Sequence, residues 1–246
     1  MSQVFNPVNT VAPLSNVAMV MGAMDRVLKG NPPERLLVLH GHAGYGKTTA
    51  CNYAANKTRA YRVECCSHWT RKSLLQAILH EMGIIHGNNN ISDMFDQAVE
   101  QLGKSRRPLI IDEADHLMHN STIELVRDIY DKAQAVVLLS GEENLPSKLA
   151  RWQRLESRVL QYIPAQPADL SDIEHLARLY CPGVAIAAEW LRELHKQTGG
   201  NTRRVVVDLN RRRCELEHMV RGEVTLSAWG QRGWYTGHRP EPRKAV

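Results

Sequence analysis

The sequence lacks any uninterrupted apolar stretch of about 18 residues, the length that a membrane-spanning helix requires. Its N-terminus also lacks the basic region, apolar core and cleavage site of a secretory signal. These two absences argue against a membrane partner and against export. We therefore expect a soluble chain in the cytoplasm.

Cysteine is scarce and its spacing carries no metal or disulfide pattern. The chain has five cysteines, an odd number, and no two of them form a C-x-x-C pair. This arrangement argues against a disulfide framework and against a zinc ribbon. Apolar residues make up 43% of the chain, which is enough for one large domain or for one medium and one small domain.

Excess positive charge is absent from most of the chain. Residues 1–200 hold 21 Lys and Arg against 21 Asp and Glu, whereas residues 201–246 hold 10 against 5. The last segment therefore carries the whole net charge of +5. A basic segment of this kind suggests a polyanionic partner, although a solvated helix face and a frayed tail would explain the same charges.

A phosphate-binding loop is the strongest pattern present. It follows the apolar run at 35–40 and precedes a segment of helical character at 48–55. In such a loop backbone amides surround a polyphosphate, while the lysine and the hydroxyl group reach phosphate and Mg²⁺. The pattern G-x-x-x-x-G-K-[ST] is matched by Gly41, His42, Ala43, Gly44, Tyr45, Gly46, Lys47 and Thr48, and Thr49 follows in the predicted helix.

Apolar strands alternate with helical patterns up to about residue 166. Continuous apolarity predicts strands that are buried on both faces, as in a parallel sheet covered by helices. Ser92 and Ser171 are the predicted caps of two helices. Predicted strands lie at 35–40, 60–66, 108–113, 135–141 and 158–163.

Helical patterns alone follow from about residue 169. We therefore expect four parts. They are an N-terminal arm and helix at 1–30, an α/β nucleotide-binding core at 31–166, a small all-helical lid at 167–221, and a basic irregular tail at 222–246.

Two carboxylates end the predicted strand at 108–113. Asp112 there can bind Mg²⁺, and the adjacent Glu113 can orient or deprotonate the water that attacks the γ-phosphate of ATP. Charge that builds up on the transferred phosphoryl group also calls for arginines, supplied in cis or by a neighbouring subunit. Arg151, Arg154 and Arg158 flank the last strand, and Arg203 opens a predicted lid helix.

These features together resemble an AAA+ ATPase. Residues of about 10–215 resemble more narrowly the B protein of Mu-like transposing phages and the AAA+ regulator of Tn7-like transposons. The narrower likeness rests on the short arm before the first strand and on the segment from Tyr61 to Leu75. The wider likeness rests on the phosphate loop, the strand Leu109–Glu113, the strand that ends in Ser140-Gly141, Arg158 before the last strand, and Gly200-Asn201-Thr202-Arg203.

The resemblance implies a five-stranded parallel sheet of order 5-1-4-3-2 with a helical lid. It also implies an ATPase that uses ATP and Mg²⁺ and assembles as a homo-oligomer, a helical filament or a ring, on double-stranded DNA with little sequence preference. Such an assembly would deliver target DNA to a transposase in a bacterial cell and would be encoded by a phage or transposon.

Residue roles follow from the same resemblance. Lys47 and Thr48 would contact phosphate, Thr48 and Asp112 the metal, and Glu113 the attacking water. Arg203 would sense nucleotide from the lid, Arg158 would act in trans with Arg154 as its substitute, and Ser140 or Glu142 would be the polar sensor after the fourth strand. The loop and helix start after the second strand would face DNA through Thr70, Arg71 and Lys72.

Two other functions share part of this pattern. A helicase loader or a secretion-type AAA+ ATPase would carry every nucleotide-binding feature. A small-molecule P-loop kinase is less favoured, because it would need an arginine-rich lid over a second substrate and would not use the strand-ending Asp-Glu pair for hydrolysis.

Overall fold

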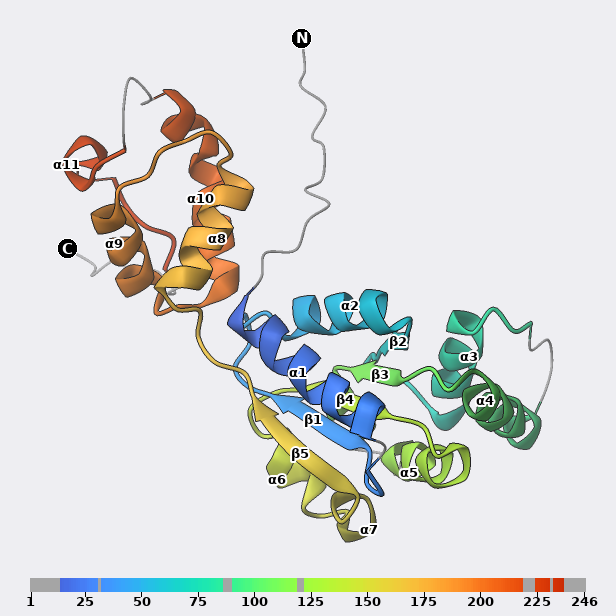
Figure 1. Cartoon of the computed structure of the whole chain (residues 1–246). Coiled ribbons are helices and arrows are strands. Elements are labelled where there is room, and N and C mark those ends of the chain that lie inside the picture. The colour runs from blue at the N-terminus through green and yellow to red at the C-terminus, as the bar shows by residue number, and fades with distance from the viewer. Residues whose placement is uncertain are drawn as a thin grey trace, which may run out of the picture. The chain divides into compact units, whose positions relative to one another are not determined.

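The computed structural model describes residues 14–30, 32–85, 90–118, 122–218, 224–230 and 232–236. The chain divides into two compact units, each described here by itself (Figure 1). An α/β unit extends from Asn16 to Ala165, and a helical unit comprises Ser15 and the chain from Gln166 onward. The division lies one residue from the predicted end of the core. The first helix belongs to the α/β unit from Asn16 onward.

Five parallel strands form the sheet of the α/β unit, in the order β2-β3-β4-β1-β5. This is the predicted order read from the other edge, so the predicted fold class is confirmed. The three central strands are almost entirely buried, which explains their continuous apolar sequences. The strands are β1 (Leu36–His40), β2 (Tyr61–Glu64), β3 (Leu109–Asp112), β4 (Val137–Gly141) and β5 (Val159–Pro164).

Helices cover both faces of this sheet. Figure 1 shows α2 over one face and α5, α6 and α7 on the other. The α helices of the unit are α1 (Ser15–Gly30), α2 (Lys47–Thr58), α3 (Arg71–Glu81), α4 (Ile91–Ser105), α5 (Thr122–Ala133), α6 (Leu145–Leu149) and α7 (Gln153–Glu156), and a 3-10 turn η1 (Ala114–Leu117) follows β3.

Two predicted helix caps are wrong by two residues. Helix α4 is capped by Asn90, whose side chain accepts a hydrogen bond from the amide of Asp93, and not by Ser92. Helix α8 (Leu170–Tyr180) is capped by Asp169 through the amide of Asp172, and not by Ser171. In both helices the earlier polar residue satisfies an amide of the first turn, so the serine becomes part of the helix.

The helical unit contains α8, α9 (Ala188–Thr198), α10 (Thr202–His218) and α11 (Leu226–Trp229). The irregular tail predicted from residue 222 is wrong for residues 224–229, whereas residues 232–236 have no regular secondary structure. Val224 pairs with Ile186 in a parallel bridge, and Trp229 is buried against Trp190. Aromatic burial therefore orders a segment whose glycines suggested a loop. None of the described helices is both long enough and apolar enough to cross a bilayer.

Candidate nucleotide-binding site

The predicted phosphate-binding loop connects the end of β1 to the start of α2. Gly41 has a φ angle of 153°, and a Cβ atom there would lie 3.0 Å from the Cβ of Ala165 and 3.1 Å from its carbonyl oxygen. Gly46, the N-cap of α2, has a φ angle of 82°, in the left-handed region. The glycines of the pattern therefore stand where the backbone excludes larger side chains.

A buried asparagine supports this loop from outside the pattern. Asn16, at the start of α1, is 5% exposed, and its side-chain amide donates a 2.7 Å hydrogen bond to the carbonyl of Tyr45. No local sequence signal predicted this contact, because it joins residues 29 positions apart. The first helix thus fixes the loop as well as covering the sheet.

The loop leads into a helix start that suits an anion. The amides of the first turn of α2 have no acceptor within the helix, and this turn contains no acidic residue. The side chains of Thr48 and Thr49 are exposed there. The positive end of the helix dipole and a hydroxyl group are consequently available to a phosphate.

Lys47 bends back onto the loop. Its Nζ donates hydrogen bonds to the carbonyl oxygens of Gly41, at 2.7 Å, and His42, at 3.0 Å. Burial lowers the pKa of this lysine, and the negative charges of Glu113 and Asp112 oppose the shift. A phosphate that offered more acceptors than these two carbonyls would draw the ammonium group outward.

Asp112 lies at the carboxyl end of β3 and is 1% exposed. One carboxylate oxygen, Oδ1, accepts from the amide of Glu113 at 3.1 Å, and the other, Oδ2, accepts from Arg62 at 2.8 Å. Arg62 was not among the predicted site residues. The pairing of β2 with β3 brings it to Asp112 from 50 positions away.

Glu113 follows in a conformation that most residues avoid. Its φ angle of 53° is in the left-handed region, where it forms the N-cap of η1. Burial raises the pKa of this carboxyl group, and the neighbouring charge of Asp112 raises it further. A strained, half-buried carboxylate with a raised pKa is suited to accept a proton.

The oxygen donors here fit Mg²⁺. This ion prefers carboxylate, hydroxyl, water and phosphate oxygens, and Thr48 and Asp112 offer a hydroxyl and a carboxylate. Asp112 is buried and already paired with Arg62, and a buried carboxylate favours a cation beside it. When bound, the ion would neutralise phosphate charge, while Thr48 and Asp112 would hold it.

Asp115, the third acidic residue of the stretch 112–115, connects two loops of the α/β unit by hydrogen bonds. Asp115 accepts hydrogen bonds from the amide of Glu142, at 2.6 Å, and from Nζ of Lys148, at 2.7 Å. It therefore ties η1 to the turn after β4. The next residue in that turn, Glu143, pairs with Nδ1 of His42 in the phosphate loop.

Ser140, the predicted polar sensor, is fully buried beside the thiol of Cys51, whose pKa burial raises to about 12. Glu142, the alternative sensor, has its carboxylate near enough to Lys47 to influence the pKa of that lysine.

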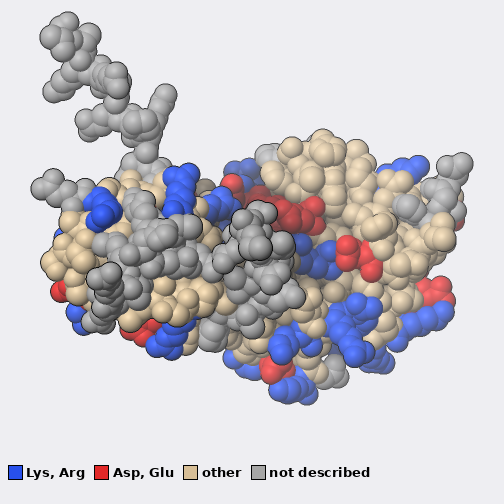
Figure 2. Space-filling model, turned by 90° about the horizontal axis from the view of Figure 1, so that it is seen from above, with Lys and Arg blue, Asp and Glu red and all other residues tan. Residues whose placement is uncertain are grey.

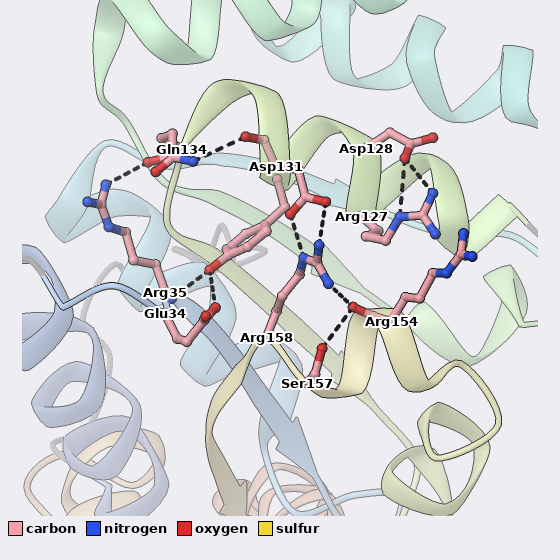
Figure 3. Close-up of polar contacts among 10 residues, drawn as sticks. Glu34, Arg35, Arg127, Asp128, Asp131, Gln134, Arg154, Ser157 and Arg158 are labelled. Atoms are coloured by element: carbon pink, nitrogen blue, oxygen red, sulfur yellow. Dashed lines mark hydrogen bonds and ion pairs between the residues drawn. The ribbon is translucent and has the colours of Figure 1, made fainter.

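Figure 3 shows how the two candidate trans arginines are placed. The guanidinium of Arg158 forms a two-point ion pair with Asp131, with 2.8 Å between Nη2 and Oδ2, and also donates to the carbonyl of Arg154. The exposed side chain of Arg154 points away from this pair, and no ion pair of it is found within the described residues. It lines a pocket of about 230 Å³ with Arg127 and Arg151.

The remaining predicted residues lie at two helix starts. Thr70 caps α3 by accepting from the amide of Ser73, and Arg71 and Lys72 form its exposed first turn. Arg203 is exposed in the first turn of α10, in the helical unit. Its predicted sensing role remains a prediction, as do the roles of the other site residues.

Comparison with known families supports the class of this domain. Residues 32–149 match the family model described as an AAA domain. This match covers just under half of the chain. With the phosphate loop and the sheet order it shows an AAA+ fold for the core, a fold whose members use ATP and Mg²⁺. A search of curated protein sequences finds no similar sequence.

Solved structures with a similar fold include ORC1 of Aeropyrum pernix in complex with DNA, with a TM-score of 0.61 and 18% identity over 92% of this chain and 66% of that one. Cdc6p of Pyrobaculum aerophilum has a TM-score of 0.61 and 16% identity over 87% and 65%. The RuvB Holliday junction branch migration motor of Thermotoga maritima has a TM-score of 0.60 and 17% identity over 87% and 66%. This chain thus spans slightly less than two thirds of their length, and at this identity they show the fold alone.

Proposed function

We propose that this chain is an ATP-dependent DNA-binding AAA+ protein that oligomerises on duplex DNA and delivers target DNA to a transposase. The nucleotide half of this function rests on the loop, Asp112 and Glu113. The DNA half rests chiefly on the start of α3, where Arg71 and Lys72 are exposed and no acidic residue lies in the first turn. Similar folds are found in ORC1, which was solved with DNA, and in RuvB, a branch migration motor.

The charge distribution agrees with a phosphate-directed contact. Figure 2 shows lysine and arginine side chains along the lower edge of the α/β unit, which is at the right of the view, with a few acidic side chains among them. Nothing in the sequence resembles a recognition helix, so the contacts would be to the phosphate backbone and would depend steeply on salt. Subunits would then assemble on duplex DNA regardless of its sequence.

Assembly would complete the nucleotide site. Each subunit would bind ATP with Mg²⁺ through Lys47, Thr48 and Asp112, Glu113 would accept a proton from the attacking water, and an arginine of the next subunit would stabilise the transferred phosphoryl group. Arg154 suits this trans role better than Arg158, because Asp131 already holds Arg158 within its own subunit.

The test combines ATP hydrolysis with imaging. We expect duplex DNA to stimulate hydrolysis, and negative-stain images to show filaments or rings on DNA with a slowly hydrolysed ATP analogue but not with ADP. Lys47→Ala, which removes the phosphate-binding charge, should form no assembly. Unchanged monomers under every condition would refute the proposal.

A helicase-loader function is the second candidate, because such a protein would carry the same nucleotide-binding loop and the same Asp112-Glu113 pair. A strand-transfer assay with a candidate partner transposase separates the two functions. Stimulation of strand transfer by the ATP-bound protein supports target delivery. DNA-dependent assembly without such stimulation favours the loader.

A further inference from the structure

An arginine stands in the edge strand β2, directly beside the metal-binding aspartate. The guanidinium of Arg62 is 2.8 Å from Oδ2 of Asp112 and 3.0 Å from Oε2 of Glu64. Its side chain is 19% exposed, and that of Asp112 is 1% exposed. Arg62 therefore joins the innermost carboxylate of the site to an exposed carboxylate at the edge of the sheet.

Arg62 supplies the positive charge that Asp112 requires when no metal is present. A buried carboxylate is costly without a cation. The other nearby cation, Lys47, donates its hydrogen bonds to the carbonyls of Gly41 and His42.

The contact also fixes the direction of the carboxylate. Oδ1 of Asp112 accepts from the amide of Glu113, which follows β3, and Oδ2 accepts from Arg62 of β2, so a donor on each side holds the plane of the carboxylate. The register of the strands makes this possible, because Arg62 is opposite Ile110 and Glu64 is opposite Asp112. The buried Nε of Arg62 has no hydrogen-bond partner among the described residues. The guanidinium is therefore held chiefly through its terminal nitrogen.

We propose that Arg62 is a positioning residue for Asp112, which it neutralises and orients in the metal-free site and for which it competes with Mg²⁺. Its charge raises the Mg²⁺ concentration that nucleotide binding requires, so that Asp112 engages the metal only when ATP phosphates help to bind it. This inference rests on the ATP- and Mg²⁺-binding role of the core and is independent of DNA and of the transposase.

The first test measures the ion pair without any ligand. Arg62→Met leaves Asp112 buried and unpaired, so we expect it to lower the denaturant midpoint of unfolding clearly. In an Asp112→Asn background the same substitution should change the midpoint little, because no buried charge remains. An equal decrease in both backgrounds would show that Arg62 acts only through packing, and would overturn the proposal.

The second test measures the competition with Mg²⁺. Arg62→Gln keeps an N–H donor but removes the charge, so half-maximal binding of a fluorescent ATP analogue should occur at about tenfold lower Mg²⁺ than in the unmodified protein. Arg59→Gln is the matched control. It removes an exposed charge from a surface pocket that Arg62 also lines, and its side chain forms no ion pair with the described residues.

The Arg59→Gln protein should require the same Mg²⁺ concentration as the unmodified one. Equal shifts in the two variants, or no shift in Arg62→Gln, would contradict the competition. If the unmodified protein bound no ATP analogue, the nucleotide function itself would fail, while the unfolding comparison would still decide whether Arg62 pairs with Asp112.

Discussion

Glu113 combines two properties that favour proton transfer at the cost of stability. Its backbone is in the left-handed region, and its carboxyl pKa is raised, first by burial and then by the charge of Asp112. A raised pKa means that the folded state favours the protonated form. The stabilisation from this proton is present at low pH and is lost as the pH rises through the pKa of the folded state.

Glu113→Gln should separate assembly from hydrolysis. The amide cannot accept a proton, so turnover should fall by about 10²-fold or more, while ATP-dependent assembly on DNA persists. At neutral pH the variant should also unfold at a higher temperature than the unmodified protein, because it removes the repulsion from Asp112. ATPase assays, imaging and melting curves measure the three effects.

The acid limb of the rate provides a second check on this residue. Turnover in the unmodified protein should decline on acidification at a higher pH than the usual pKa of a glutamate would give, because only the carboxylate can act as a base. An equal loss of assembly and hydrolysis in Glu113→Gln would contradict the assigned role.

At the level of elements, the sequence predicts strands better than helix ends. All five strands were expected near their observed positions, and for the three central strands burial on both faces explains the long apolar runs. The caps at Ser92 and Ser171 were wrong because Asn90 and Asp169, two residues earlier, compete for the same amides. Local patterns therefore show that a helix exists more reliably than where it begins.

The candidate site likewise contains residues that the sequence predicts and contacts that it does not predict. The loop and the Asp112-Glu113 pair are contiguous in sequence and were predicted from it. The contacts of Arg62 with Asp112 and of Asn16 with Tyr45 depend on strand register and helix packing across 50 and 29 positions. The docking of Trp229 on Trp190 likewise joins distant segments, so composition alone suggested a loop there.

The start of α3 provides a prediction about DNA. Lys72→Ala should weaken binding to duplex DNA and reduce the slope of log affinity against log salt by about one, because one phosphate contact is lost. Lys57→Ala, in the last turn of α2, removes an equal exposed charge from a helix end not assigned to DNA and should leave the slope unchanged. An unchanged slope for Lys72→Ala would remove this residue from the DNA contact.

The cluster of Trp190, Trp229 and Trp234 in the helical unit predicts that the segment around Trp229 stabilises the fold of this unit. Trp229 is 1% exposed, and its ring centroid lies 5.3 Å from those of Trp190 and Trp234. Trp229→Ala should lower the unfolding free energy by about 3–5 kcal/mol. Trp234→Ala, at a half-buried position, should cost less. Denaturant unfolding followed by tryptophan fluorescence measures the free energy of unfolding of both variants. An unchanged value for Trp229→Ala would mean that this segment does not stabilise the helical unit.

At the scale of the whole molecule, the candidate nucleotide site combines the phosphate-binding loop with the proposed metal ligand Asp112 and the proposed base Glu113, and neither candidate trans arginine is held at that loop. Arg158 is paired with Asp131, and Arg154 points away from that pair into a pocket with other arginines (Figure 3). A single subunit would thus bind ATP through its own loop and carboxylates, and the proposed neighbour would add the arginine that hydrolysis requires. Assembly and hydrolysis are then coupled by geometry.

Mixed assemblies test this coupling. Glu113→Gln subunits bind ATP and retain Arg154 but cannot activate water, whereas Arg154→Ala subunits retain Glu113 but offer no trans arginine. Each variant alone should be nearly inactive. In an equal mixture about a quarter of the interfaces would place an Arg154→Ala site beside a Glu113→Gln neighbour, and these sites should recover hydrolysis.

The matched mixture uses Arg158→Ala in place of Arg154→Ala. Because Arg158 pairs with Asp131 of its own subunit, its loss should act within that subunit, and a Glu113→Gln neighbour should not restore it. Recovery with Arg158→Ala and none with Arg154→Ala would assign the trans role to Arg158, and Asp131 would then have to release it during assembly. Recovery in neither mixture would mean that each subunit completes its own site, and the proposed link between assembly and hydrolysis would fail.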